Sequence, residues 1–148
     1  MKKVLYIDMD NVLVDFSSGI SRLDEETKRK YKGRLDEVPD IFSLMDPIEQ
    51  SVDSFKKLAQ VFDTYILSTA PWENPSAWSD KLAWVKKYLG KSAHKRLILS
   101  HHKNLNIGDY LIDDRTSNGV DKFMGEHIHF RSQNFPDWIS VVSYLLTK

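Results

Sequence analysis

The sequence predicts an α/β fold in which helices cover a parallel β-sheet, and three observations support this class. Short apolar runs that end in polar or acidic residues recur along the chain, at 4–7, 65–67, 96–100, 109–112 and 127–130. Stretches with helical spacing of apolar residues separate several of these runs. The length of 148 residues suits one ordinary domain with a single core. Because alternating strands and helices imply right-handed crossovers, we expect one parallel sheet within a single domain, 1–148.

The composition excludes several classes of function. The 21 lysines and arginines balance the 21 aspartates and glutamates, so the charge suggests neither a nucleic-acid polymer nor an anionic membrane as partner. The absence of cysteine excludes a disulfide framework, a thiol nucleophile and a thiolate zinc site. No apolar stretch approaches the length of a membrane span, and the run 4–7 is too short for a secretion signal. We therefore expect a soluble cytoplasmic protein.

The first predicted strand ends in two aspartates that are one residue apart. The run 4–7 is short and apolar, as is typical of a strand buried on both faces, and Asp8 and Asp10 follow it. In open α/β sheets, ligands bind at the carboxyl ends of the strands. Two carboxylates this close repel each other unless a cation or a shared proton compensates. We expect a metal here, in particular Mg²⁺, because Mg²⁺ favours carboxylate and phosphate oxygens.

The segment after this strand predicts a turn, a helix and a charged insertion. Asn11 tolerates left-handed backbone angles and could make the turn, and the apolar residues within 12–16 lead into an expected helix. Residues 17–40 are rich in charge. Their few apolar anchors are Leu23, Tyr31 and Leu35. Because a structureless loop of this length is uncommon in a compact domain, we expect a small helical cap insertion at about 17–46; a solvated connection is the alternative.

The middle of the chain predicts a core helix and then a strand that ends in hydroxyl groups. The helix, 51–60, carries apolar residues at helical spacing, namely Val52, Phe55, Leu58 and Ala59. The strand, 65–67, ends in Ser68 and Thr69, and Pro71 prevents its simple continuation. Two hydroxyl groups are therefore expected at the same edge of the sheet as the aspartates.

Two more amphipathic helices are predicted. Asn74 and Pro75 offer a helix start, and Gly90 offers a stop. The apolar stripe between them consists of Trp78, Leu82, Val85 and Leu89. A C-terminal helix is predicted by an inner stripe that consists of Trp138, Val141, Val142, Leu145 and Leu146. We expect both helices to pack on the sheet through these stripes.

A second acidic pair, Asp113 and Asp114, follows the apolar run 110–112. In a parallel sheet, the ends of the first, second and fourth predicted strands would meet in one crevice. This pair would then join the first acidic pair beside the two hydroxyl groups. For the first pair alone, the alternative is an acidic turn that caps the following helix. Together, the pairs predict a magnesium site beside a hydrogen-bonding pocket.

Such a site would repel a phosphate dianion, by roughly 4 kcal/mol per close charge pair at an effective dielectric constant near 20. A lysine should therefore complement the metal. Lys81 is the first candidate, because it lies about 9 Å closer to the carboxyl edge of the sheet than Lys87, at about 1.5 Å rise per residue. Lys103, in the loop after the third predicted strand, is the second candidate. A solvated surface charge is the usual alternative for a single lysine.

These ordered motifs resemble those of the haloacid dehalogenase (HAD) superfamily phosphatases. Residues 8–13 are similar to the first motif, Ser68 to the second, Lys81 to the third and the pair 113–114 to the fourth. More narrowly, the chain resembles the 5′(3′)-deoxyribonucleotidases. The matching stretches are 81–88 with Gly90, 111–115 and the turn Asp46-Pro47. The resemblance implies a HAD-like three-layer Rossmannoid fold and a Mg²⁺-dependent phosphoric monoester hydrolase.

The resemblance also implies roles for the acidic residues. Asp8 would be the nucleophile and form an aspartyl-phosphate. Asp10 would protonate the leaving oxygen and later activate water. The Asp8 carboxylate, the Asp10 backbone carbonyl and Asp114 would hold Mg²⁺, with Asp113 as an alternative ligand.

The phosphoryl group, by the same resemblance, would be held by hydroxyl groups and lysines. Ser68 and Lys81 would contact its oxygens, with Thr69 and Lys103 nearby. Fixed positive charge would stabilise the equatorial oxygens in both displacements. Asn11 stands where the superfamily usually has glycine, and asparagine also accepts unusual backbone angles.

A nucleoside monophosphate, deoxy forms included, is the substrate that the resemblance implies. The 5′(3′)-deoxyribonucleotidases carry a longer cap with aromatic residues against the nucleobase. Here the nearest aromatic residues are Tyr31, Phe16 and Phe42, and the two phenylalanines could equally belong to the core. We expect weak preference among bases, and another small phosphate ester is the alternative substrate. We interpret His101 and His102 as a surface pair.

Two other classes of protein share parts of this pattern. A phospho-accepting signalling receiver combines a parallel sheet with aspartates, a hydroxyl and a lysine. In a receiver the acceptor aspartate lies mid-chain and the lysine lies late, whereas here the strand that ends in hydroxyl groups lies mid-chain and an acidic pair lies late. A catalytically silent binding domain of the same fold is the other alternative. The retention of Asp8 and Asp10 argues against it, because the fold alone does not require them. The oligomeric state stays open, with a homodimer as one possibility.

Overall fold

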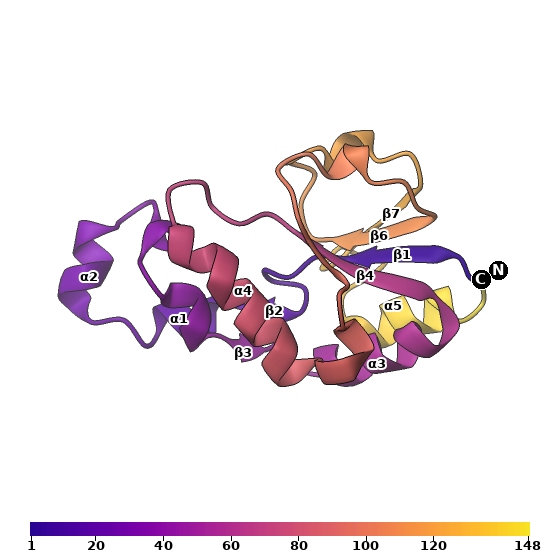
Figure 1. Cartoon of the computed structure of the whole chain (residues 1–148), viewed down its shortest axis with the longest axis horizontal. Coiled ribbons are helices and arrows are strands. Elements are labelled where there is room, and N and C mark those ends of the chain that lie inside the picture. The colour runs from indigo at the N-terminus through magenta and orange to yellow at the C-terminus, as the bar shows by residue number, and fades with distance from the viewer.

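The computed structural model describes all 148 residues and contains a five-stranded sheet in the order β5-β4-β1-β6-β7 (Figure 1). The strands are β1 Val4–Ile7, β4 Asp63–Ser68, β5 Leu97–Leu99, β6 Tyr110–Asp113 and β7 Glu126–His129. Every neighbouring pair is parallel. The predicted α/β class and parallel sheet are confirmed, with strand ends that lie within two residues of the expected ones.

Alternate residues of the strands face two different layers. Leu5, Ile7 and Ile112 belong to the larger apolar core, whereas Tyr6 and Leu111 belong to a smaller one. Helices α3 (Ser51–Val61) and α5 (Trp138–Leu145) pack together below the sheet in Figure 1. The smaller core includes Val120, which begins the 3₁₀ helix η5 (Val120–Lys122), and Phe123, which follows that helix. The loops above the sheet in Figure 1 include η5 and η4 (Lys103–Leu105).

The segment between β1 and α3 forms several short elements at the end of the molecule remote from the termini (Figure 1). They are β2 Val14–Asp15, α1 Phe16–Ile20, α2 Glu25–Lys30, η1 Leu35–Glu37, η2 Ile41–Leu44 and β3 Asp46–Pro47. Strands β2 and β3 pair antiparallel. The expected helix after Asn11 starts only at Phe16, because a turn and β2 come first. Asn11 has φ of 62°, the left-handed conformation expected of it.

Helix α4 (Pro75–Tyr88) presents a different face to the core from the predicted one. Its buried residues are Ala77, Lys81, Trp84 and Val85. In the predicted stripe, Trp78 is 38% and Leu82 is 44% exposed, so the prediction is wrong for these two residues. The reason is tertiary: α4 packs on η2, and Trp84 Nε1 donates a hydrogen bond to the Met45 carbonyl at 3.1 Å. That contact turns the Lys81 side of the helix inward.

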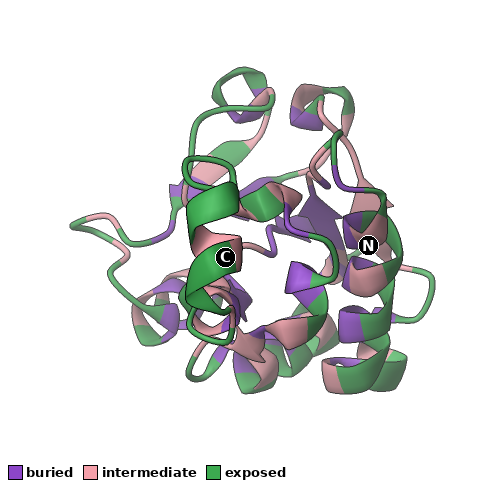
Figure 2. Cartoon of the chain, turned by 90° about the vertical axis from the view of Figure 1, so that its left-hand side faces the viewer, coloured by how far each residue is buried: buried purple, intermediate pink, exposed green.

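Helix α5 follows its predicted stripe except at the end. Trp138, Val141, Val142 and Leu145 are buried, whereas Leu146 lies beyond the helix and is exposed, so its assignment to the stripe is wrong. Figure 2, viewed from the end that carries α2, shows buried residues on the strands and on one side of the helices around them. No helix of the chain combines the length and the apolar character that a membrane span requires.

Candidate active site

Three adjacent strands deliver the predicted site residues to one edge of the sheet. β1 lies between β4 and β6, and Asp8, Ser68 and Asp113 stand at or directly after their carboxyl ends. The Asp8 N–H donates to the Ile112 carbonyl at 2.9 Å, which continues the pairing of β1 and β6. A cavity of about 540 Å³ opens at this edge. The expected crevice therefore exists where the topology predicts it.

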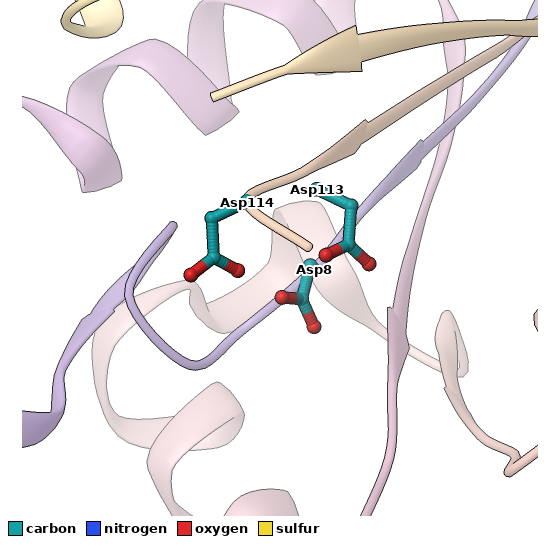
Figure 3. A group of neighbouring side chains, drawn as sticks. All are labelled: Asp8, Asp113 and Asp114. Carbon is teal, nitrogen blue, oxygen red and sulfur yellow. The ribbon is translucent and has the colours of Figure 1, made fainter. Parts of the chain in front are cut away.

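An acidic cluster forms the floor of the cavity. Asp8, Asp113 and Asp114 each offer a carboxylate oxygen, and these oxygens lie within 4.8 Å of one another. Figure 3 shows Asp113 and Asp114 pointing from the end of β6 toward Asp8. Asp8 is 7% and Asp113 is 2% exposed, whereas Asp114 is half-buried. The two acidic pairs of the sequence thus meet through three of their four members.

Lys103 compensates part of this negative charge. Its Nζ donates to Asp8 Oδ1 at 2.9 Å and to Asp113 Oδ2 at 2.6 Å, and the residue is 3% exposed. The Lys103 N–H donates to the Asn118 carbonyl at 2.8 Å, so the loop after β6 fixes the start of η4. We expected Lys81 to be the better placed lysine, but Lys103 is the one that touches Asp8.

Lys81 lies in the same site, on the other side of β1. Its Nζ donates to Asp10 Oδ1 at 3.0 Å and to Ser68 Oγ at 2.9 Å. Lys81 is fully buried, and its Nζ lies 4.5 Å from the ring centroid of Phe42. A buried ammonium needs such partners, since an unpaired one would carry a large desolvation cost. Lys81 therefore links Asp10, in the loop after β1, to Ser68 at the end of β4.

Thr69 lies at the wall of the cavity with its hydroxyl already engaged. Its Oγ1 donates to the Ser100 carbonyl at 2.7 Å, and the Ser100 N–H donates to the Ser68 carbonyl at 2.8 Å. These contacts tie the ends of β4 and β5 together. The hydroxyl oxygen of Thr69 still has lone pairs, but its proton is committed to the backbone.

The electrostatics of the cluster disfavour full ionisation. Burial raises the pKa of Asp8 to about 6; Lys103 opposes this shift, and the charges of Asp113 and Asp10 add to it. Burial and the nearby charge of Asp8 raise the pKa of Asp114 to about 6. Burial alone would lower the pKa of Lys103, but Asp8 and Asp113 outweigh it and raise that pKa. A further cation would relieve the remaining repulsion between carboxylates.

The donor set fits a hard divalent cation. Oxygen ligands from carboxylates are the ligands that Mg²⁺ prefers. Asp113 is the least available of the three, because Oδ2 accepts from Lys103 and Oδ1 accepts from the Arg115 N–H at 2.9 Å. Asp114 is more exposed than Asp113 and borders the same cavity. The cluster is therefore open on the side of Asp8 and Asp114.

The cavity wall also includes Trp72 and His101, which are not among the predicted site residues. Trp72, in the loop after β4, borders the cavity and is 76% exposed. His101 also borders it, and its ring centroid lies 6.0 Å from that of Trp72 and 6.2 Å from that of Trp78. His101 is thus a half-buried residue at the cavity wall, whereas His102 is exposed and lies outside it. The available signal in the sequence was a tryptophan four residues after Ser68, in the loop at the carboxyl end of the strand.

The segment before β3 supplies the opposite wall of the cavity. Phe16, Leu35, Asp36 and Glu37 border it, whereas Phe42 is buried with its ring centroid 5.8 Å from that of Phe16. Asn74 at the start of α4 fastens η1, because its Nδ2 donates to the carbonyls of Asp36 and Val38 at 2.9 Å each. Of the two phenylalanines left open by the sequence, Phe16 reaches the cavity and Phe42 belongs to the core.

Several proteins of similar sequence are nucleotidases by name. The family model described as "5′ nucleotidase, deoxy (Pyrimidine), cytosolic type C protein" matches residues 24–136. A protein of Vibrio phage KVP40 that is named among the 5′(3′)-deoxyribonucleotidases is 60% identical, over 99% of this chain and 86% of its own. The Bacillus subtilis 5′(3′)-deoxyribonucleotidase is 30% identical, over 88% and 86%. The human cytosolic-type 5′(3′)-deoxyribonucleotidase is 28% identical, over 84% and 77%.

The fold is also found among solved structures. A haloacid dehalogenase-like hydrolase of Streptococcus pneumoniae aligns with a TM-score of 0.56, over 97% of this chain and 98% of that chain. The sequence identity is 12%, so this likeness concerns the fold alone. The HAD-like fold expected from the motifs is confirmed.

Proposed function

Because the chain belongs to the deoxy (pyrimidine) cytosolic type C 5′-nucleotidase family, and is thus a phosphoric monoester hydrolase, we propose that it is a Mg²⁺-dependent 5′(3′)-deoxyribonucleotidase. The observation that supports the proposal most is the acidic cluster with its lysine. Oxygens of Asp8, Asp113 and Asp114 lie within 4.8 Å of one another, and Lys103 Nζ donates to Asp8. This arrangement provides a carboxylate nucleophile beside positive charge.

The proposed reaction consists of two displacements at phosphorus. A carboxylate oxygen of Asp8 attacks the phosphorus, the bond to the ester oxygen breaks, and Asp10 gives its proton to the leaving alkoxide. Water then attacks the aspartyl-phosphate and gives a proton to Asp10. The bond between Asp8 and phosphorus breaks, which releases phosphate and restores both aspartates. Asp10 must be protonated in the first displacement and ionised in the second. Its contact with Lys81 holds the carboxylate in place.

Mg²⁺ would be held by the carboxylates of Asp8 and Asp114 and by the Asp10 backbone carbonyl, with Asp113 behind them. When bound, it supplies positive charge that offsets the repulsion between the carboxylates and the phosphate. Lys103 and Thr69, which border the cavity, are proposed to contact the phosphoryl oxygens. Ser68, which the sequence favoured for this contact, is fully buried and is proposed to support the site by accepting a hydrogen bond from Lys81. In this scheme Lys103, rather than Lys81, takes the part of the third HAD motif, because it touches the nucleophile.

The proposed substrate is a deoxyribonucleoside monophosphate, and residues 17–46 are proposed to act as its cap. Support comes from the cavity wall. Phe16 and Leu35 offer apolar contacts from the cap side, and Trp72 offers an exposed ring from the loop after β4. The cavity volume of about 540 Å³ is sufficient for a small organic ligand. Another small phosphate ester is the alternative substrate.

The test is hydrolysis of a panel of nucleoside monophosphates with and without Mg²⁺, for the wild type and Asp8→Asn. The amide keeps the shape of the side chain but cannot attack phosphorus, so kcat should fall by several orders of magnitude. The matched control is Asp121→Asn, an exposed aspartate of η5 outside the cavity wall. Undiminished turnover in Asp8→Asn, with a normal circular dichroism spectrum, would exclude the mechanism.

A further inference from the structure

Two histidines of β7 are hydrogen-bonded to the backbone of the acidic pair at the end of β6. His127 Nε2 lies 2.9 Å from the Asp113 carbonyl oxygen, and His129 Nε2 lies 3.0 Å from the Asp114 carbonyl oxygen. A carbonyl oxygen only accepts, so each imidazole must carry its proton on Nε2. Neither histidine borders the cavity. They therefore contact the acidic pair through its main chain and from outside the site.

The strand pairing explains why both imidazoles reach consecutive carbonyls. β6 and β7 are parallel, with Leu111 opposite His127 and Asp113 opposite His129. Residues two apart in a strand point to the same face. The two imidazoles lie side by side, with ring centroids 5.2 Å apart and ring planes 22° apart. Each ring reaches forward along the strand to a carbonyl of β6 or of the residue that follows it.

The two bonds hold the peptide groups on both sides of the Asp114 Cα atom. The Asp113 carbonyl belongs to the peptide that precedes this Cα, and the Asp114 carbonyl belongs to the peptide that follows it. The backbone has only two soft torsions per residue, and fixing both flanking planes fixes both torsions of Asp114. The direction of its Cα–Cβ bond, and hence the region that its carboxylate can reach, is then set.

Asp114 needs this support more than Asp113 does. The Asp113 side chain is held by Lys103 and by the Arg115 N–H, and its carbonyl also accepts from the Phe130 N–H at 3.1 Å. Asp114 is the first residue after β6, and the exposed residues 115–118 follow it. The His129 bond is the side-chain contact that holds its carbonyl. The aim of the Asp114 carboxylate therefore depends on the backbone more than on side-chain partners.

We propose that His127 and His129 are positioning residues. They orient the Asp114 carboxylate toward the cation site and thereby set the affinity of that site for Mg²⁺. The inference rests on the proposed function only in taking Asp114 as a metal ligand. The physical basis is general, because groups that orient a ligand from behind commonly change metal affinity about 10- to 100-fold when they are removed. Neither histidine needs to touch the substrate.

The test compares glutamine with leucine at each position. A glutamine amide can donate from a nitrogen at about the reach of Nε2, whereas leucine fills similar space and donates nothing. The variants are His129→Gln, His129→Leu, and the pairs His127→Gln/His129→Gln and His127→Leu/His129→Leu. His102→Leu is the matched control, since His102 is an exposed histidine in the loop after β5. The Kd for Mg²⁺ is measured by titration calorimetry without substrate, and the melting temperature is measured with EDTA.

The expected result is that the leucine pair raises the Kd for Mg²⁺ about tenfold, that His129→Leu raises it less, and that glutamine restores most of the affinity. A purely structural role would lower the melting temperature without changing the Kd of the folded protein. His129 is exposed, so His129→Leu decides the matter if the leucine pair does not fold.

Two results would overturn the inference: an unchanged Kd in the leucine variants, or glutamine variants that bind Mg²⁺ as weakly as the leucine ones. Nucleotide hydrolysis by the wild type is measured in parallel. An active wild type with unchanged Kd values in the variants would reject the positioning role alone. A wild type that neither binds Mg²⁺ nor hydrolyses nucleotides would reject both the positioning role and the proposed function.

Discussion

Lys103 and Asp8 are 95 residues apart in the chain, yet Lys103 Nζ donates to Asp8 Oδ1 at 2.9 Å. The contact crosses from η4 to the end of β1 and is almost closed to solvent, with Lys103 3% and Asp8 7% exposed. The same ammonium also bonds to Asp113. A single cation therefore compensates two buried carboxylates, and the local structure depends on it.

Replacement of Lys103 by methionine should destabilise the metal-free protein at pH 7. Removing one member of a buried ion pair typically costs about 3–5 kcal/mol, because the remaining charge stays buried without a partner. Urea unfolding in EDTA measures this loss. Saturating Mg²⁺ should recover part of the stability without restoring normal kcat. Lys122→Met, at an exposed position of η5, should change neither quantity; equal stability of Lys103→Met and wild type would contradict the argument.

The stability of the metal-free protein should fall as the pH rises from about 4 to about 6. Asp8 and Asp114 have pKa values raised from 3.8 to about 6 in the folded chain, so folding favours their protonated forms. Unfolding therefore releases protons in this range, and ionisation weakens the fold as the pH increases. Melting temperatures in EDTA across this range check the sign.

Asp114→Asn should reduce that pH dependence and raise the melting temperature in EDTA at pH 7. The substitution removes a charge that Asp8 repels and that burial disfavours. The same variant should bind Mg²⁺ more weakly. If its affinity for Mg²⁺ equals that of the wild type, Asp114 is not a ligand, and Asp113 becomes the candidate.

The backbone at Asn11 offers a test that needs no metal. Asn11 has φ of 62°, and its N–H donates to the Val14 carbonyl at 2.7 Å. Left-handed backbone costs a residue with an ordinary β-carbon about 1–2 kcal/mol, whereas glycine adopts it freely. Asn11→Ala should therefore destabilise the protein by about 1 kcal/mol, and Asn11→Gly should not. Urea unfolding measures the stability of both variants. If Asn11→Gly loses more stability than Asn11→Ala, the asparagine side chain matters more than its backbone conformation.

The sheet and the acidic cluster could be predicted because they depend on local patterns. Apolar runs that end in Asp8, in Ser68 and in Asp113 are visible in the sequence, and parallel pairing brings such ends to one edge. Asn11 was predictable for a similar reason, since its residue type already suits a turn. These features need no knowledge of how the helices pack.

The orientation of α4 could not be predicted from spacing, because another segment decides it. Trp78 and Leu82 recur at helical spacing with Val85, but η2 covers the side of α4 that carries Lys81 and Trp84. The burial of a lysine looks unfavourable until its partners Asp10 and Ser68 are known. The contact of Lys103 with Asp8 could not be predicted for the same reason, since η4 brings Lys103 to Asp8.

Trp72 lies outside the insertion, 17–46, in which the sequence predicts contacts with the base. The expectation of weak base preference rested on the few aromatic residues near residues 17–40. Trp72 adds a ring that is 76% exposed at the cavity wall, and the ring of His101 approaches it at close to a right angle, 72°. Such a ring is available for stacking, whereas the buried ring of Phe42 is not.

Trp72→Ala should therefore weaken the hydrolysis of nucleotides more than that of base-free phosphates. Stacking of a base on an aromatic side chain is worth about 1–3 kcal/mol, which corresponds to about a 5- to 150-fold loss in kcat/KM. 2-Deoxyribose 5-phosphate, which lacks a base, should lose little. Trp78→Ala is the matched control, because Trp78 is also exposed and also near His101 but does not border the cavity.

The measurement is kcat/KM for dUMP, dTMP, dAMP, dGMP and p-nitrophenyl phosphate in each variant. Because stacking accepts any flat ring, the loss should be similar for all four bases. A loss confined to one base would mean that polar groups on the wall, such as Asp36 or Glu37, read the base edge, and equal losses in the two tryptophan variants would remove Trp72 from base recognition.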